Sequence, residues 1–195
     1  MSKRPQTPKK SRNSRTVFSA SSDSITQNPT AFLCAMSLLL AAEVILERLL
    51  GINILTIKIN FAFVAVALAA YLYGPLGGAL CYGLGDIIGT LLFPAGGYNP
   101  LFTLSNVLVG LCFGFFFSGK LNIVKIIIPV VFERTVGTLL LNTLWLKIFF
   151  IKSKGFFALM LTRVPEAAFF IVVELIILPP LLLKFGPQLK KLVNK

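Results

Sequence analysis

From residue 30 onward, the sequence alternates long apolar runs with short stretches rich in Gly, Pro and Asn. Each run approaches the ~20 residues that a helix needs to cross the hydrocarbon core of a bilayer. The remaining length fits six such runs joined by short connections. The pattern therefore predicts an all-α bundle of six transmembrane helices, over residues 30–50, 57–73, 76–93, 102–119, 122–150 and 156–184.

Turn-forming residues place the helix boundaries. Gly51 and Asn53 follow the first run, and Gly74-Pro75 separates the second run from the third. Residues 94–100 separate the third run from the fourth, and residues 118–122 follow the fourth. Because Gly and Pro are the strongest local breaks in regular structure, we expect the helices to end at these places.

The first 29 residues differ from the rest of the chain. They contain six Lys and Arg, seven Ser and a single acidic residue, with no apolar periodicity. Low hydrophobicity with charge of one sign predicts disorder, and the absence of an apolar core before residue 30 argues against a secretory signal. We predict a disordered basic cytoplasmic tail at 1–29 and a membrane domain at 30–195. An organelle transit peptide is the alternative interpretation of the tail.

The composition supports a membrane protein. Hydrophobic residues make up 56% of the chain, charged residues 13%, and the mean hydropathy is +0.84. A soluble domain of this size carries about 25% charged residues. Of the net charge of +12, +5 lies in the short tail and +7 is spread thinly over the apolar body. This distribution is typical of a basic fringe on a membrane protein and not of a nucleic-acid-binding surface.

Several kinds of active site are excluded. The chain has no His, so a His-containing catalytic triad or metal site cannot form. Its three Cys lie far apart inside apolar runs, which predicts neither disulfides nor a metal site. Gly114–Lys120 fits the first seven positions of a phosphate-binding loop, but Leu121 stands where the loop needs a hydroxyl. We therefore expect no nucleotide, metal or cofactor in this chain.

The distribution of Lys and Arg predicts the orientation. With a cytoplasmic N-terminus, twelve lie on that side: the six of the tail, Lys120, Lys125, Lys184, Lys190, Lys191 and Lys195. Six lie on the other side: Arg48, Lys58, Lys147, Lys152, Lys154 and Arg163. The positive-inside rule therefore places both termini in the cytoplasm, as an even number of spans requires.

Small residues recur four positions apart in several of the predicted helices, including Gly74/Gly78, Gly85/Gly89 and Gly110/Gly114. Such spacing lets two helix backbones approach closely, and we interpret most of these pairs as packing inside the bundle. Ala31 and Ala35 differ because they begin the first helix on the cytoplasmic side. Their patch is a candidate surface for a partner helix.

Charged residues also occur at membrane depth. Asp86 lies within the third predicted helix, Glu133 and Arg134 within the fifth, and Glu174 within the sixth. A charge near the bilayer centre costs at least about 2.5–3.5 kcal/mol, so it is normally paired or functional.

Asn142 and Trp145 are three residues apart and share one face of the fifth helix. An amide beside a large ring suits a planar ligand. An interhelical hydrogen bond with an interfacial Trp explains the pair equally well.

The segment around residues 93–106 combines aromatic and polar groups. Glycines allow a tight turn before Tyr98, whose ring can cover a planar ligand, and Phe102 follows at the start of the next helix. Thr103 and Asn106 are one turn apart.

Three cations on the predicted external side complete this set: Arg48, Lys58 and Arg163. The guanidinium group binds carboxylates through two parallel hydrogen bonds. Apolar walls with a few convergent polar groups are the usual form of a small-molecule site. The set favours a flat heteroaromatic ligand that bears carboxylates.

Four motifs together carry a resemblance to a known family. They are Leu72-Tyr-Gly-Pro75-Leu-Gly-Gly, Gly85-Asp-Ile-Ile-Gly-Thr-Leu-Leu-Phe-Pro94, Tyr98-Asn-Pro-Leu-Phe-Thr-Leu-Ser105 and Leu141-Asn-Thr-Leu-Trp-Leu146. In this order, the chain resembles the substrate-binding (S) components of energy-coupling factor (ECF) vitamin transporters, specifically the folate family.

The resemblance implies a vitamin site open to the outside of the cell membrane. It also implies a complex with a transmembrane coupling subunit and two ATP-hydrolysing subunits. By this resemblance, Arg48 holds a folate carboxylate or a pterin oxygen, and Arg163 faces the glutamate end. Asn106, Asn142 and Trp145 face the pterin or benzoyl rings. Asp86 either pairs with N–H groups of the pterin or makes a structural bond between helices.

The sequence leaves two alternative functions. In the first, the same kind of module binds a different vitamin or a precursor. A small membrane transferase is the other, but such enzymes commonly hold magnesium with clustered Asp residues, and Asp86 is the only Asp after residue 29.

Overall fold

The computed structural model of the chain describes residues 29–193, except for 55–56, 95–97, 120 and 152–154. The predicted tail at 1–29 therefore lies outside the described residues, apart from Pro29. Four of the described helices are long and apolar enough to cross a membrane: Pro29–Leu49, Phe63–Leu92, Pro100–Phe117 and Phe156–Lys191. The class predicted from the sequence, an all-helical membrane protein, is confirmed at this level.

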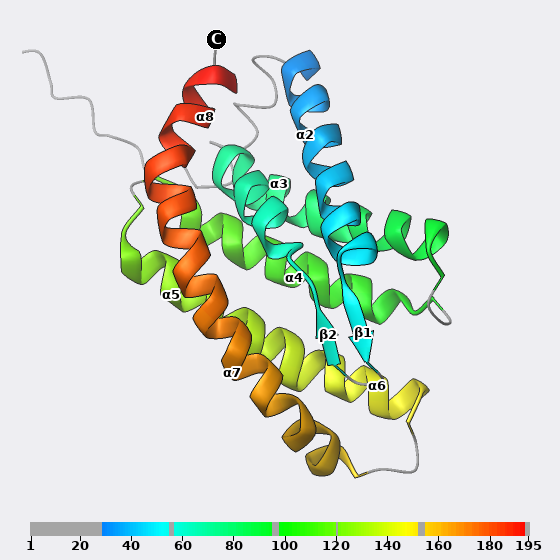
Figure 1. Cartoon of the computed structure of the whole chain (residues 1–195). Helices are drawn as coiled ribbons and strands as arrows, with labels where there is room; N and C mark the ends of the chain where they lie inside the picture. Colours follow the sequence, from blue (N-terminus) through cyan, green and yellow to red (C-terminus); the bar gives the residue numbers. More distant parts are fainter. Residues whose placement is uncertain (1–28, 55–56, 95–97, 120, 152–154, 194–195) are drawn as a thin grey trace, which may run out of the picture.

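The helices follow the predicted order (Figure 1). Helix α2 (Pro29–Val44) continues into the π-helical turn η1 (Ile45–Leu49), and α3 (Phe63–Leu92) is followed by α4 (Pro100–Phe117). A fourth helical stretch comprises α5 (Ile123–Phe132), the π-helix η2 (Glu133–Asn142) and α6 (Thr143–Phe149). The last comprises α7 (Phe156–Pro180), the π-helix η3 (Leu181–Phe185) and α8 (Gly186–Val193). Most predicted helix ends agree with these bounds to within two residues, but the last helical stretch continues to Val193, nine residues past its predicted end at 184.

The start of the second predicted helix is wrong. Residues 57–59 form strand β2 (Ile57–Ile59), which pairs antiparallel with β1 (Ile52–Ile54), and the helix begins only at Phe63. The register places Ile52 opposite Ile59 and Ile54 opposite Ile57. The physical reason is visible in the sequence, where β-branched Ile residues alternate with other residues through both strands, a pattern that favours extended backbone over helix.

The predicted break at Gly74-Pro75 is confirmed. Within α3, Gly74 has φ 66° and ψ −153°, outside the helical region, so the helix is kinked there. A positive φ is readily adopted only by Gly, and Pro75 lacks the N–H that would bond across the break. The predicted helices at 57–73 and 76–93 are thus the two halves of α3, joined without a loop.

Close approach of backbones holds α3 against α4. A Cβ atom on Gly78 would overlap the carbonyl oxygen of Gly110, and one on Gly114 would overlap Pro75. The packing role predicted for these small residues is therefore confirmed.

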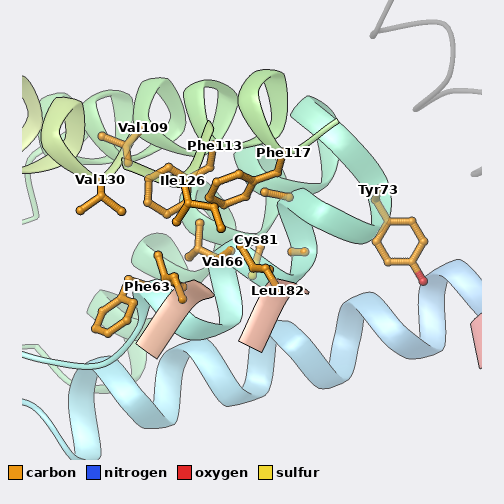
Figure 2. Packing of buried hydrophobic residues seen from close by; sticks show 14 of the residues in the cluster. Phe63, Val66, Tyr73, Cys81, Val109, Phe113, Phe117, Ile126, Val130 and Leu182 are labelled. Carbon is orange, nitrogen blue, oxygen red and sulfur yellow. The ribbon is translucent and has the colours of Figure 1, made fainter. Parts of the chain in front are cut away.

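A cluster of buried apolar side chains lies where these helices meet α5, α7 and η3. Figure 2 shows Phe113 and Phe117 of α4 beside Ile126 of α5, together with Val66 and Cys81 of α3. The rings of Phe113 and Phe117 lie 5.2 Å apart, between centroids. This cluster fixes the relative positions of the helices that carry the polar side chains described below.

The beginning of α2 and the end of α8 lie at the same end of the molecule (Figure 1). Strands β1 and β2, helix α6 and the beginning of α7 lie toward the opposite end. Both ends of the described chain thus leave the bundle on one side.

One buried ion cluster joins η2 to α7. The Nε atom of Arg134 donates to Glu174 Oε1 at 2.9 Å, and Nη2 donates to the same oxygen. Glu133 lies 3.7 Å from Arg134, and the guanidinium carbon lies 4.5 Å from the centroid of the Phe170 ring. The expectation that charges at membrane depth are paired is confirmed for these three residues.

We predict that Glu174→Ala lowers the free energy of unfolding by about 3–5 kcal/mol, because it leaves the Arg134 charge buried without its main partner. Thermal unfolding of the detergent-solubilised protein measures the effect. Thr135→Ala, an exposed position next to Arg134, is the control and should stay within about 0.5 kcal/mol of the wild type. Equal losses in the two variants would contradict a specific role for the ion pair.

Candidate functional site

Asp86, in the second half of α3, is the centre of a polar network that joins three elements of the described chain. Its Oδ1 atom accepts a hydrogen bond from Arg48 Nη2 at 3.2 Å, and its Oδ2 atom accepts one from Thr103 Oγ1 at 2.6 Å. Arg48 comes from η1 and Thr103 from the first turn of α4. Three elements that are distant in the sequence therefore meet at one carboxylate.

Neighbouring residues extend this network. Arg48 Nη2 also donates to Thr90 Oγ1 at 2.8 Å, and the Tyr98 hydroxyl lies 3.2 Å from Thr103 Oγ1. Gly89 lies against the Arg48 side chain, where a Cβ atom would come 2.9 Å from Nε. The structure thus brings four of the predicted site residues together: Arg48, Asp86, Tyr98 and Thr103.

The start of α4 is fixed by its own sequence. The Asn99 side chain accepts a hydrogen bond from Leu101 N at 3.0 Å, and Pro100 occupies the first helical position. Both residue types are favoured at these positions, so the helix begins there and presents Thr103 and Ser105 to the interior.

A second contact fixes Trp145. Its indole N–H donates to Ser105 Oγ at 2.9 Å, and Ser105 in turn donates to the Leu101 carbonyl at 3.1 Å. Since the Ser105 proton is used in the second bond, its oxygen is an acceptor for the indole. The ring of Trp145 is therefore held against α4, which is the helix that also carries Thr103.

Arg163 lies in a different environment from Arg48. Its Nη1 atom donates to Thr143 Oγ1 at 3.4 Å, and its Nε atom lies 3.6 Å from Glu166 Oε2. Thr143 directly follows Asn142, so Arg163 reaches the helical stretch that carries Asn142 and Trp145. The described contacts do not join Arg163 to Asp86.

Three buried polar atoms of predicted site residues have no hydrogen-bond partner within the described part of the chain. They are two donors, Arg48 Nε and Arg163 Nε, and one acceptor, Asn142 Oδ1. Buried polar groups are satisfied in the great majority of cases, so such atoms need an explanation. A polar ligand would supply it.

The remaining predicted site residues make fewer described contacts. Asn106 is half-buried in α4, and the Phe102 ring lies 6.1 Å from that of Phe150. Lys58 lies in β2, and its side chain is outside the described residues. Ala31 is exposed near the start of α2, whereas Ala35 is half-buried and packs against the core.

Sequence reasoning missed several residues around these groups: Glu43, Glu47, Thr90, Ser105, Thr143 and Glu166. Glu43 and Glu47 are both buried, and Glu47 lies 3.9 Å from Arg48. Their spacing of four residues in an apolar helix was the available signal, since it places two carboxylates on one face. Ser105 and Thr143 carried no such signal, because a small hydroxyl inside an apolar helix commonly bonds its own backbone.

Chemically, the arrangement offers both hydrogen-bond acceptors and donors in a mostly apolar bundle. Asp86 accepts, Arg48 and Arg163 donate, and Trp145 provides a ring for stacking. It holds none of the nucleophile–base pairs that covalent catalysis requires, as far as the described residues show. Such a set is suited to binding a planar polar molecule.

Comparisons with known proteins agree with this interpretation. The family model for the substrate-specific component of ECF transporters matches residues 30–182. The folate transporter FolT of Clostridium novyi is 29% identical over 144 residues, which cover 73% of this chain and 83% of that protein. FolT of Leuconostoc mesenteroides is 29% identical over 114 residues, 57% of this chain and 60% of that protein.

A solved structure shows the same fold. A crystal structure of FolT bound with folic acid superposes with a TM-score of 0.70 and 26% sequence identity. The match covers 75% of this chain and 89% of that one.

The helical fold and these comparisons together define a membrane transporter component that is not an enzyme. The chain belongs to the family of ECF transporter substrate-specific components. The resemblance inferred from the sequence motifs is confirmed, and the transferase alternative is wrong.

We predict that Ser105→Ala changes the fluorescence emission of Trp145, the only Trp in the chain, even without ligand. The indole N–H of the half-buried Trp145 loses its acceptor, which costs up to about 1–3 kcal/mol, and the ring is then free to reorient. Steady-state emission and anisotropy measure the change. Ser105→Thr, which keeps the hydroxyl, should retain the wild-type spectrum, and an unchanged spectrum in Ser105→Ala would contradict the contact.

Proposed function

We propose that this chain is the folate-binding S component of an ECF transporter. The observation that carries the proposal is the set of three buried polar atoms without a hydrogen-bond partner, on Arg48, Asn142 and Arg163, all residues expected to contact the ligand. The likeness to FolT proteins, one of them solved with folic acid, supports folate as the ligand.

In this proposal, each part of folate meets a group of matching chemistry. Arg48 binds a pterin oxygen or a carboxylate, and Asp86 accepts from the pterin amino and ring N–H groups. Asn106, Asn142 and Trp145 contact the rings, with Tyr98, Phe102 and Thr103 at the mouth. Arg163 and Lys58 bind the glutamate carboxylates, for which a guanidinium group is well suited.

We propose further that six helices cross the membrane, with both termini in the cytoplasm. The two halves of α3 count as separate spans, and residues 123–149 supply another. The common end shared by the start of α2 and the end of α8 supports this orientation, as does the excess of Lys and Arg predicted on that side (Figure 1). The folate site then opens to the outside of a prokaryotic-type plasma membrane.

Uptake in this proposal needs other subunits. A transmembrane coupling subunit and two ATP-hydrolysing subunits supply the energy, because the sequence contains no complete nucleotide-binding motif. Ala31 and Ala35, near the start of α2, form the surface that the coupling subunit contacts.

The first test concerns the cations. Arg48→Ala or Arg163→Ala should weaken folate binding by more than the ~1–2 kcal/mol expected for an ordinary hydrogen bond, which is more than about fivefold to thirtyfold. Titration of the detergent-solubilised protein with folate, riboflavin, thiamine and biotin measures affinity and ligand identity together. Lys184→Ala, a charge loss at the opposite end, is the control. Unchanged affinity in both arginine variants removes these residues from the site, and preference for another vitamin overturns folate as the ligand.

The second test uses the fluorescence of Trp145. If its ring stacks on folate, binding should quench the emission strongly. Trp145→Phe should keep part of the affinity because a ring remains, while Trp145→Ala should lose much more. Equal affinities for these two variants would favour a purely structural Trp145.

The third test concerns the coupling surface. Ala31→Trp should bind folate normally but fail to co-purify with the coupling subunit and fail to support uptake, because association inside a membrane depends on close van der Waals contact. Ala31 is the better position because Ala35 also packs against the core. Transport at the wild-type rate in Ala31→Trp would place the docking surface elsewhere.

A further inference from the structure

All the acidic residues in the described part of the chain are buried. They are Glu43, Glu47, Asp86, Glu133, Glu166 and Glu174. The sequence contains seven acidic residues, and the remaining one, Asp23, precedes the described residues. The described surface therefore carries cations without any carboxylate side chain to balance them.

The exposed cations gather at the C-terminal end. Lys184 of η3 and Lys190 and Lys191 of α8 are all exposed, and none forms an ion pair with another described residue. They lie at the end of the molecule where α2 begins (Figure 1). Among the described residues no carboxylate side chain lies at the surface to balance these lysines, so this end offers positive charge to an anionic group of another molecule.

Packing on α3 positions the start of α8 and one of these lysines, Lys190. Gly186 lies against the ring of Tyr71, where a Cβ atom would come 2.7 Å from Cε1. The Lys190 ammonium lies 5.7 Å from the centroid of the same ring. Helix α8 is thus seated on Tyr71 with its lysines at the surface.

Apolar side chains lie beside the cations. Leu183 is 44% exposed and Phe185 is 50% exposed, on either side of Lys184 in the sequence. A ligand that fits this surface has an anionic group for the lysines and an alkyl portion for Leu183 and Phe185. Free phosphate or an acidic protein surface matches only the first of these features.

We propose that Lys184, Lys190 and Lys191, with Leu183 and Phe185, bind an anionic phospholipid, whose phosphate contacts the lysines and whose acyl chains contact the apolar pair. Basic residues close to an anionic membrane surface strengthen binding by about fivefold each. The lipid then neutralises the basic end of the bundle. This proposal is independent of the ligand bound at the Asp86 network.

The test titrates the full-length, detergent-solubilised protein with phosphatidylglycerol or phosphatidylcholine and counts bound lipids by native mass spectrometry. The wild type should bind phosphatidylglycerol at least tenfold more tightly, and added salt should reduce the difference. A variant with Lys184, Lys190 and Lys191 all changed to Gln should lose the preference and still bind its vitamin. Equal affinity for the two lipids in the wild type, or an undiminished preference in this variant, overturns the proposal.

Two single variants keep the test decisive if the triple variant fails to fold. Lys191→Gln should weaken phosphatidylglycerol binding about fivefold, whereas Lys147→Gln in α6, a matched charge loss near the opposite end, should not. The same result for both overturns the proposal. Glycerol 3-phosphate and inorganic phosphate serve as probes without acyl chains. If either one fully displaces phosphatidylglycerol at an equal concentration, the site binds anions in general and the lipid assignment is wrong.

Discussion

The contact between Arg48 and Asp86 organises the candidate site. Through it, η1 is joined to α3, and through Thr103 the same carboxylate is joined to α4. In an apolar bundle neither charge is stable alone, because an unpaired buried ion costs far more than a buried pair. The requirement that these two charges meet therefore constrains the positions of three helices around one point. Any ligand that binds there must match a cation and an anion together.

Much of the fold follows from local sequence signals. The break at Gly74-Pro75 and the start of α4 at Pro100 were predictable, because only Gly readily adopts the required φ and Pro favours the first turn of a helix. The hairpin was missed because an Ile-rich run was assigned to a helix by its hydrophobicity alone. Its alternation of residue types was the better guide.

The candidate site was predictable in part of its membership but not in its pairing. Arg48, Asp86, Tyr98 and Thr103 were candidates because polar groups at membrane depth are costly, and the structure joins all four. Which cation meets which acid depends on the helix arrangement, which spacing along one chain does not determine. For the same reason the contact of Ser105 with Trp145, across forty residues, had no local signal.

The kink at Gly74 has a mechanical consequence. Since the two halves of α3 are joined by a single non-helical residue, no slack separates the half that carries Asp86 from the half that carries the apolar cluster around Val66. Gly114 of α4 lies against this corner, so close that a Cβ atom there would overlap Pro75. The corner therefore has no room for even one added methyl group, and the bend of α3 and the position of α4 are set together.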